Sequence, residues 1–385
     1  MTKRTNILII GMLDSIHVGR WLSQFRDQDL DFTLVASQRY RKLHPTIHAL
    51  VDGDSNASYQ IHTQVKTHWL MPFWDYFRFE LVSKGALFNS RSKALEGLMA
   101  CTEFDFVHGL EFQGAGYLLN EVNEETLHKS EIILTNWGSD IYYYMDYPDH
   151  KKIIIALLAK INRYSAECIR DYNLARQLGF KGIELPCIPN AGGFEFQNSE
   201  FHHLKPSMRK QIIVKGYGGK FGRAGLILEL IPIIARRFPE FSFFIYSVTP
   251  DLISQIKNLP ADVKNRIRFV SINNRMAHED VIQEFRRSRL YIGCSVSDGI
   301  STSFLESLYT GAFPIQTNTS CMSEWVSLGC IASEVSLNSE EILVKITEAL
   351  SKDEMVDNAG LVNYRIARHH LNRDRIREKA LSFYA

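Results

Sequence analysis

The sequence lacks long hydrophobic runs. No stretch of its 385 residues approaches the roughly 18 consecutive apolar residues that a membrane-spanning helix requires. The apolar run that follows MTKRT at the start is too short for the core of a signal peptide, and it carries no small-residue cleavage pattern. We therefore expect this run to form a first β-strand.

Cysteine is scarce and shows no regular spacing. The six cysteines form no CxxC pair, and several of them lie in apolar runs. This pattern gives no support to a disulfide framework or a zinc site. We expect reduced, buried thiols in a cytosolic protein.

The sequence has no excess of charge of either sign. Lysine and arginine number 44, aspartate and glutamate number 43, and the formal net charge is +1. This balance does not favour a nucleic acid partner, so any anion site must be local. The loop GYGGKFGRAG fits neither the dinucleotide fingerprint GxGxxG nor the phosphate-binding loop GxxxxGK, so neither motif supports NAD or ATP as a ligand.

Short apolar segments alternate with amphipathic helices along the whole chain. A chain of 385 residues exceeds one ordinary hydrophobic core, so we expect two domains. Both halves read as doubly wound α/β domains, whose ligand sites lie beyond the carboxyl ends of the strands. The clearest predicted strands are 6–10, 32–36, 104–108, 132–135, 211–215, 242–248, 267–270, 290–294 and 312–316, and the clearest helices are 15–28, 151–164, 225–238, 278–287 and 302–311.

The segment 291–326 carries the strongest functional signal. A predicted strand is followed by a polar loop and then by a helix that begins near Thr302 and stops at Gly311. Asp298 lies in the loop, and Glu306 follows eight residues later on the polar side of the helix. Two carboxylates and the free N–H groups of a helix N-terminus therefore meet near one point. Such a point suits a ligand with hydroxyls at one end and phosphates at the other.

A glycine-rich basic loop, residues 216–225, follows the predicted strand 211–215 at the same edge of the second sheet. The cations around its glycines are Lys220 and Arg223 within the loop and Lys215 just before it. Glycines allow backbone N–H groups to approach a phosphate, and the cations would neutralise a diphosphate. A purely structural glycine turn is the alternative. The glycines are Gly216, Gly218, Gly219, Gly222 and Gly225.

The first half presents polar residues at its own strand ends. His17 and Arg20 follow the first strand one turn apart, and Glu111 and Asp140 follow two later strands. We expect these residues to contact a ligand. The alternatives are a surface His and Arg at a helix start, and an Asp that only caps a turn.

Three further features have plainer explanations. Asp52 and Asp54 form a DxD in a Gly/Ser/Asn stretch, which favours a solvated turn over a metal site. The aromatic stretch 69–88 favours core helices, with contact to a lipid acceptor or membrane surface as the alternative. The basic residues of the helix 151–164 favour a solvated face over anionic lipid.

Six short motifs follow one another along the chain: IHVGRW (16–21), FVHGLE (106–111), NWGSDI (136–141), IPNAGG (188–193), DGISTSFLE (298–306) and TGAFPIQTNTSCMSEW (310–325). Taken together and in this order, these motifs resemble the retaining glycosyltransferases of family four, which have GT-B architecture. The resemblance covers nearly the whole chain.

The resemblance implies a role for each candidate residue. Glu306 would bind the ribose hydroxyls of a nucleotide, and Asp298 would bind the donor sugar. Lys220 and Arg223, with Lys215, would bind the diphosphate. The other donor-site residues would be Gly216, Gly218, Gly219, Gly299, Ile300, Ser301 and Thr302, with the amides of Ser301 and Thr302 on the distal phosphate; the acceptor-site residues would be His17, Arg20, Glu111 and Trp137, with Asp140 orienting the acceptor or taking its proton.

Three positions depart from the family pattern. The first acidic residue is Asp298 where Glu is common, Trp137 stands where many members have His, and the basic loop has the form K-G-Y…G-R-A. The implied activity is transfer of a sugar, with retention, from a nucleotide diphosphate sugar to a hydroxyl of a glycan or lipid-linked acceptor, without metal or cofactor. A non-catalytic nucleotide-sugar-binding subunit and a nucleotide-sugar epimerase are the alternatives.

The resemblance also implies a domain plan and a setting. We expect an acceptor-binding domain at 1–190, a donor-binding domain at 191–364 and a terminal helix at 365–385 that crosses back onto the first domain. Family members often serve polysaccharide or glycolipid assembly. We therefore expect a cytoplasmic protein, with the inner membrane surface as a candidate partner and no nucleic acid partner.

Overall fold

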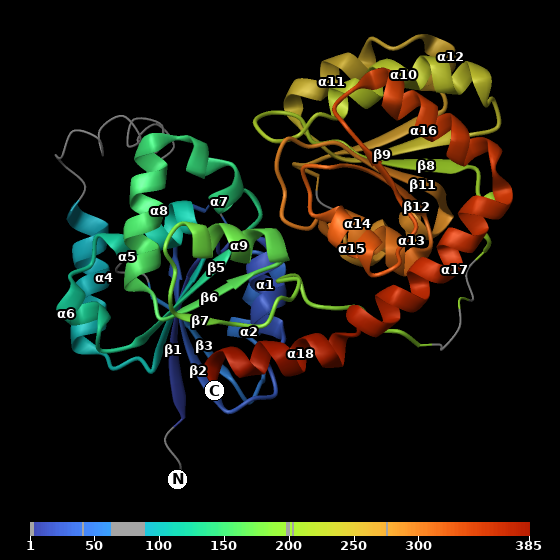
Figure 1. The fold of residues 1–385 in the computed structure, drawn as a ribbon. Coiled ribbons are helices and arrows are strands. Elements are labelled where there is room, and N and C mark those ends of the chain that lie inside the picture. Colours follow the sequence, from blue (N-terminus) through green and yellow to red (C-terminus); the bar gives the residue numbers. More distant parts are fainter. Residues whose placement is uncertain (1–3, 41, 63–88, 198–200, 202–203, 275) are drawn as a thin grey trace. The chain divides into compact units, whose positions relative to one another are not determined.

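The computed structural model describes residues 4–40, 42–62, 89–197, 201, 204–274 and 276–385 (Figure 1). The described chain divides into two compact units. The first contains residues 1–193 and 374–385, and the second contains residues 194–373. The aromatic stretch 69–88, for which the sequence favours core helices, lies outside the described residues.

The first unit is built on a parallel sheet of seven strands in the order β3-β2-β1-β4-β5-β6-β7. The direction of strand progression reverses between β1 and β4, and this reversal creates a switch point at the carboxyl ends of the strands. The strands are β1 (Thr5–Gly11), β2 (Leu30–Ala36), β3 (Ser58–Ile61), β4 (Phe106–Leu110), β5 (Glu131–Asn136), β6 (Arg163–Ala166) and β7 (Ile183–Glu184).

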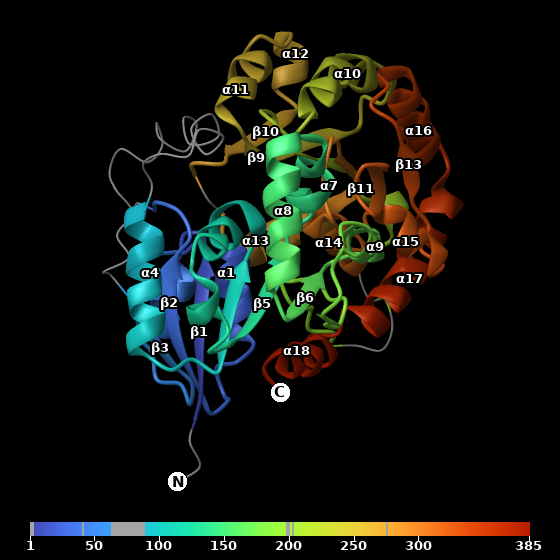
Figure 2. The ribbon, with the colours of Figure 1, turned by 60° about the vertical axis from the view of Figure 1, so that its left-hand side comes forward.

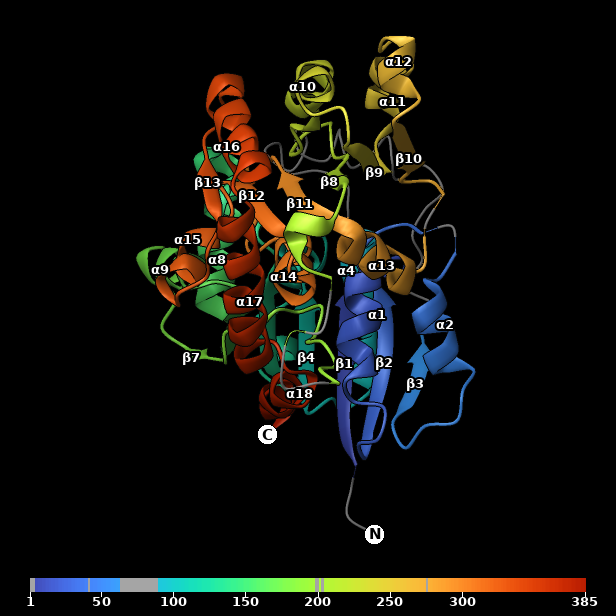
Figure 3. The same cartoon turned by 90° about the vertical axis from the view of Figure 1, so that its right-hand side faces the viewer.

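Helices cover both faces of this sheet. The helices α1 and α2 bury Trp21 and Ile47 against one face, and Figure 3 shows them on the side turned toward the viewer. The helices α4 and α8 bury Leu95 and Leu157 against the other face, where Figure 2 shows them. The helices are α1 (Ile16–Ser23), α2 (Pro45–Val51), α4 (Asn89–Cys101), α5 (Tyr117–Asn120), α6 (Glu124–Leu127), α7 (Ser139–Tyr142), α8 (Pro148–Lys160) and α9 (Ile169–Gln177).

The C-terminal end of the chain belongs to the core of the first unit. It consists of α18 (Arg373–Leu381) and a final 3-10 turn (Ser382–Tyr384). The Trp21 Nε1–H donates to the Tyr384 hydroxyl at 3.1 Å, and that hydroxyl lies 2.8 Å from Nδ1 of His108. Burial lowers the pKa of His108 to about 3, so its ring is neutral within this network.

The second unit is built on a parallel sheet of six strands in the order β10-β9-β8-β11-β12-β13. Here the strand order reverses between β8 and β11, so the loops after these two strands flank the switch point. The strands are β8 (Gln211–Lys215), β9 (Ser242–Val248), β10 (Ile267–Ser271), β11 (Ser288–Gly293), β12 (Phe313–Thr317) and β13 (Ser333–Val335).

Two sets of helices enclose the second sheet. The helices α10, α11 and α16 contribute to the core on one face, and α13 and α14 contribute to the core on the other (Figure 1). The helix α17 contributes to both cores. Gly311 ends α14, as the sequence predicted, and its φ of 78° is the left-handed conformation common at helix ends. The helices are α10 (Ala224–Arg237), α11 (Pro250–Lys257), α12 (Ala261–Lys264), α13 (His278–Arg287), α14 (Thr302–Thr310), α15 (Met322–Ser327), α16 (Ser339–Ser351) and α17 (Asp353–His370).

The prediction of two doubly wound α/β domains is confirmed. Two predicted helices were wrong at their ends. The helix expected over 15–28 stops at Ser23. The helix expected over 151–164 stops at Lys160, and β6 begins at Arg163. Ile161 is extended and Tyr164 is fully buried, so packing into the sheet overrides the helical pattern there. Within the described residues, no helix combines the length and the apolar character needed to cross a bilayer.

Candidate functional site

The two loops that the sequence singled out lie against each other at the switch point of the second unit. Gly222 and Ser295 form an isolated antiparallel bridge. The amide of Arg223 donates to the carbonyl of Cys294 at 2.9 Å, and the amide of Val296 donates to the carbonyl of Phe221 at 2.8 Å. The glycine-rich loop and the Asp298 loop therefore form one surface at the ends of β8 and β11.

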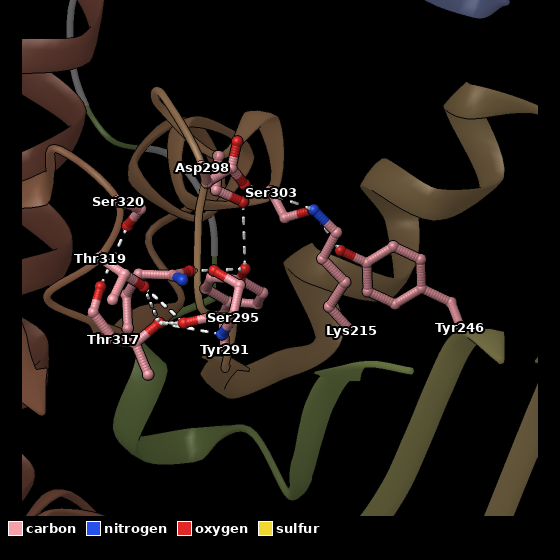
Figure 4. A network of polar contacts seen from close by, with 11 residues as sticks. Lys215, Tyr246, Tyr291, Ser295, Asp298, Ser303, Thr317, Thr319 and Ser320 are labelled. Atoms are coloured by element: carbon pink, nitrogen blue, oxygen red, sulfur yellow. Dashed lines mark hydrogen bonds and ion pairs between the residues drawn. The ribbon is translucent and has the colours of Figure 1, made fainter. Parts of the chain in front are cut away.

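A further loop, after β12, fixes the position of Asp298. Asp298 bridges to Ser320, and its amide donates to the carbonyl of Thr319 at 3.3 Å. The Thr317 hydroxyl accepts from the amide of Ser295 at 3.0 Å (Figure 4). The Asp298 loop is thus held by backbone and hydroxyl hydrogen bonds on both sides.

A lysine faces the carboxylate of this loop. Lys215, the last residue of β8, places Nζ 3.9 Å from Oδ2 of Asp298 and 4.8 Å from the centre of the Tyr217 ring. Figure 4 shows Lys215, Asp298 and Ser303 converging on one point. Burial works against the charge of Lys215, but Asp298 and weaker contributions from other groups outweigh it, so the pKa of Lys215 is raised. The ammonium group is therefore charged at neutral pH.

Glu306 does not lie on a solvated helix face. Only 6% of its side chain is exposed, and its Oε1 lies 2.7 Å from Nε2 of His278, the first residue of α13. The sequence predicted the polar character of this position correctly, but it did not identify His278 as the partner. A buried carboxylate with one bound oxygen is a well-defined hydrogen-bond acceptor for a ligand.

The N-terminus of α14 lies in the same site as Lys215, Asp298 and Glu306. No side chain caps this helix at Ser301, and the first intrahelical hydrogen bond runs from Leu305 N to Ser301 O at 3.1 Å. The N–H groups of Thr302, Ser303 and Phe304 consequently have no acceptor within the helix. Such N–H groups, together with the helix dipole, favour an anion.

The glycine-rich loop is built differently from the expectation. The amide of Gly216 donates to the carbonyl of Tyr246 at 2.8 Å. The amides of Gly218 and Gly219 donate to Thr249 Oγ1 at 3.0 Å and to Asp251 Oδ2 at 3.1 Å. These three amides hold the loop to β9 and to the start of α11. The alternative of a structural glycine turn therefore accounts for these amides.

The cations of this loop differ in their surroundings. Nη1 of Arg223 donates to the carbonyls of Gly219, Lys220 and Gly222, at 3.2, 3.3 and 2.6 Å. The Arg223 guanidinium therefore braces its own loop, whereas Lys220 is exposed. Of the predicted cations, Lys215 is the one that faces Asp298.

The first unit brings Glu111 and Asp140 together at the carboxyl ends of β4 and β5. The Glu111 carboxylate accepts from the amides of Gly114 at 2.6 Å and Ala115 at 2.7 Å. Oδ2 of Asp140 accepts from the amides of Phe112 at 3.0 Å and Trp137 at 2.9 Å. Both carboxyls cap local turns, as the alternative interpretation of Asp140 held.

Burial raises the pKa of both of these carboxyls. It raises the pKa of Glu111, against the effect of its backbone hydrogen bonds. It raises the pKa of Asp140 well above the ordinary value, and the nearby Glu111 adds to that shift. Glu111 also adopts φ 109°, a conformation that non-glycine residues rarely adopt. Two buried, unusually basic carboxyls therefore lie next to each other at this edge.

The remaining predicted residues of the first unit lie near the same edge. The rings of His17 and Trp137 meet edge to face with centroids 5.7 Å apart. Arg20 is half-buried in the same helix, α1, whose first turn is capped by the Ser15 hydroxyl. By contrast, Asp52 is exposed and lies 2.8 Å from Nδ1 of His48, as expected for a solvated turn.

Sequence reasoning missed several residues of the second unit's site. Tyr246 donates to the Ser303 hydroxyl, and Tyr291 donates to Gln316 at 2.9 Å beneath the Asp298 loop. Both tyrosines lie in strands that read as purely apolar core. The sequence signal for Tyr291 was Gly293, a glycine within an apolar strand. The structure explains this glycine, because a Cβ there would lie 2.2 Å from the Tyr291 hydroxyl.

No protein-family model matches the chain, and no curated protein matches it either. Solved structures do match it over nearly their whole length. HepE of Anabaena, crystallised with UDP-glucose, has a TM-score of 0.69 at 10% identity and covers 99% of each chain. Sucrose-phosphate synthase of Thermosynechococcus elongatus has a TM-score of 0.67 at 11% identity, covering 99% of this chain and 98% of its own.

A glycosyltransferase from Rickettsia africae ESF-5 has a TM-score of 0.65 at 13% identity, covering 100% of this chain and 98% of its own. Identities this low establish the fold alone. The fold is that of the GT-B class, with two doubly wound α/β domains, as the sequence predicted.

Proposed function

We propose that the protein is a glycosyltransferase that moves a sugar from a nucleotide diphosphate sugar to a hydroxyl acceptor. The observation that carries this proposal is the arrangement at the switch point of the second unit. There the buried Glu306, the Lys215–Asp298 pair and the uncapped N-terminus of α14 lie around one surface. The fold shared with glycosyltransferase structures supports the same conclusion.

Each part of that surface suits one part of the donor. Glu306 accepts hydrogen bonds from the ribose hydroxyls, and Asp298 accepts them from the sugar. The N–H groups at the start of α14 and the ammonium group of Lys215 bind the diphosphate. HepE, which has the same fold, was crystallised with UDP-glucose, and this supports a donor of that class.

The chemical step is departure of the diphosphate from the sugar. Negative charge develops on the bridging oxygen as that bond breaks. The helix N–H groups and Lys215 stabilise the charge because they are fixed before the reaction begins. No metal is required in this scheme, and we propose that the sugar keeps its anomeric configuration.

We propose that the acceptor binds at the first unit, near the carboxyl ends of β4 and β5. Asp140 and His17 are the candidates for orienting its hydroxyl or taking its proton, because the raised pKa of Asp140 suits a general base. Glu111 positions the turn that follows it. A glycan or lipid-linked acceptor in polysaccharide or glycolipid assembly, at the cytoplasmic face of the membrane, fits this activity.

The test is turnover followed by NMR with UDP-glucose, GDP-mannose and dTDP-glucose as donors. A glycosyltransferase releases the nucleoside diphosphate, slowly by hydrolysis when no acceptor is present. Isomerisation of the donor without release would indicate an epimerase. Binding without any release, including with added acceptor sugars, would indicate a non-catalytic binding subunit.

A further inference from the structure

Glu306 is held from outside its own helix, by His278 of α13. We propose that His278 is a positioning residue, which fixes Oε1 of Glu306 so that Oε2 is presented to the ribose hydroxyls of a nucleotide. This inference rests on the proposed function, because it assigns His278 to the donor site of the second unit.

The contact between His278 and Glu306 restricts rotation of the glutamate's carboxylate plane. The terminal torsion of a glutamate is broad, so its carboxylate plane turns easily unless one oxygen is bound. The hydrogen bond between Nε2 of His278 and Oε1 of Glu306, 2.7 Å long, holds one of the two oxygens. Recognition of a diol needs this plane fixed, since two hydroxyls must meet the carboxylate at defined angles. His278 thus supplies orientation, and Glu306 makes the contact with the ligand.

His278 is itself well anchored. It begins α13, whose Ile282 and Phe285 are buried in the same core as Phe304 of α14. The imidazole of His278 remains partly exposed, with 28% of its side chain accessible. Because Nε2 faces a carboxylate, that nitrogen carries the hydrogen in either charge state of the ring.

Other polar groups act on Glu306 without occupying its oxygens. Lys215 of β8, Tyr246 of β9 and Tyr291 of β11 interact with it electrostatically. Among the hydrogen bonds of the described residues, His278 supplies the one that reaches the carboxylate. Oε2 is therefore the oxygen that remains for a ligand.

The test compares ribonucleotides with their deoxy counterparts. Calorimetry measures the affinity of the intact protein for UDP and 2′-deoxy-UDP, and for GDP and 2′-deoxy-GDP if guanine is preferred. The wild type is expected to prefer the ribonucleotide by about tenfold, because a missing hydroxyl leaves a buried carboxylate oxygen unpaired. His278→Phe fills a similar volume but has no hydrogen-bond donor for Glu306. The preference for the ribonucleotide in this variant should fall to the value measured for Glu306→Gln.

Two controls separate positioning from folding. His278→Gln places an amide N–H near the position of Nε2 and should restore most of the preference. Glu279→Gln changes the next, exposed residue of α13 and should leave the preference unchanged. The ratio of two affinities is insensitive to a modest loss of folded protein.

Three results would overturn the inference. If His278→Phe keeps the wild-type preference while Glu306→Gln loses it, Glu306 binds ribose without help. If Glu306→Gln keeps the preference, neither residue acts on ribose. If the wild type binds no nucleoside diphosphate, the proposed function fails as well.

Discussion

Nζ of Lys215 and Oδ2 of Asp298 lie 3.9 Å apart at the carboxyl ends of the neighbouring strands β8 and β11. The pair joins the two loops that flank the switch point of the second unit. A lysine and a carboxylate at this distance partly neutralise each other. In the donor complex that we propose, the same ammonium group would face the diphosphate as a second anion, and Asp298 would accept hydrogen bonds from the sugar hydroxyls.

We expect Lys215→Met to weaken binding of the nucleoside diphosphate and to slow sugar transfer, each by at least about tenfold, since a charge-assisted hydrogen bond is lost. Calorimetry and initial rates measure the two effects. Lys210→Met is the matched control, because Lys210 is exposed and lies just before β8, at the strand's other end. Equal loss in both variants would show that Lys215 has no specific role.

The glycine-rich loop should tolerate no side chain at Gly218. A Cβ there would lie 2.3 Å from Oδ2 of Asp251 and 2.8 Å from Oγ1 of Thr249. Gly218→Ala should therefore lower the melting temperature by several degrees, since overpacking costs about 1–3 kcal/mol. Gly225→Ala is the control: its Cβ would meet nothing closer than 3.4 Å, and alanine suits a helix. Similar melting temperatures for both variants would contradict the packing described for Gly218.

The C-terminal tyrosine should stabilise the first unit. Tyr384→Phe removes the hydroxyl that bonds Trp21 and His108. Both ring nitrogens would be left buried without this partner, at a cost of about 1–3 kcal/mol, and the melting temperature should fall. Tyr147→Phe removes the hydroxyl of an exposed tyrosine and should leave the melting temperature unchanged. No difference between the two would argue against the network.

His108 should make the protein less stable in acid. Burial lowers its pKa from 6.5 to about 3, so the unfolded chain binds more protons than the folded chain between these values. The contribution of His108 to stability is therefore full above pH 6.5 and is lost as the pH falls toward 3, by about 1.4 kcal/mol per unit.

This effect appears in melting temperatures measured between about pH 7 and pH 5. His108→Gln should show a shallower decline than the wild type over that interval. His128→Gln, at an exposed position, should keep the wild-type slope. A wild-type slope in the His108 variant as well would show that another group causes the acid sensitivity.

Much of the second unit could be read from the sequence because its signals are local. An apolar run, a polar loop and a helix stop at Gly311 follow one another within 22 residues, from Leu290 to Gly311. Parallel strands bring their carboxyl ends to one edge, so the glycine-rich loop and the Asp298 loop had to lie near each other. The structure places them in direct contact.

The parts that could not be predicted depend on contacts between distant segments. His278 reaches Glu306 only because α13 and α14 pack on the same face of the sheet. Asp251 accepts from Gly219 because β9 lies beside β8, and nothing near the glycines indicates this acceptor. Arg223 was expected to bind phosphate from its place in the glycine-rich loop and from the family resemblance, and neither indicates that its guanidinium bonds to its own loop.

We propose that Glu306 and its surroundings bind a nucleotide diphosphate sugar. The most direct measurement is calorimetric titration of the wild type and of Glu306→Ala with UDP-glucose, GDP-mannose and dTDP-glucose. We predict that the wild type binds one of these donors and that Glu306→Ala binds it at least about tenfold more weakly, because hydrogen bonds to a buried carboxylate are lost. Equal affinity in the two proteins, or no binding of any donor to the wild type, would contradict the account.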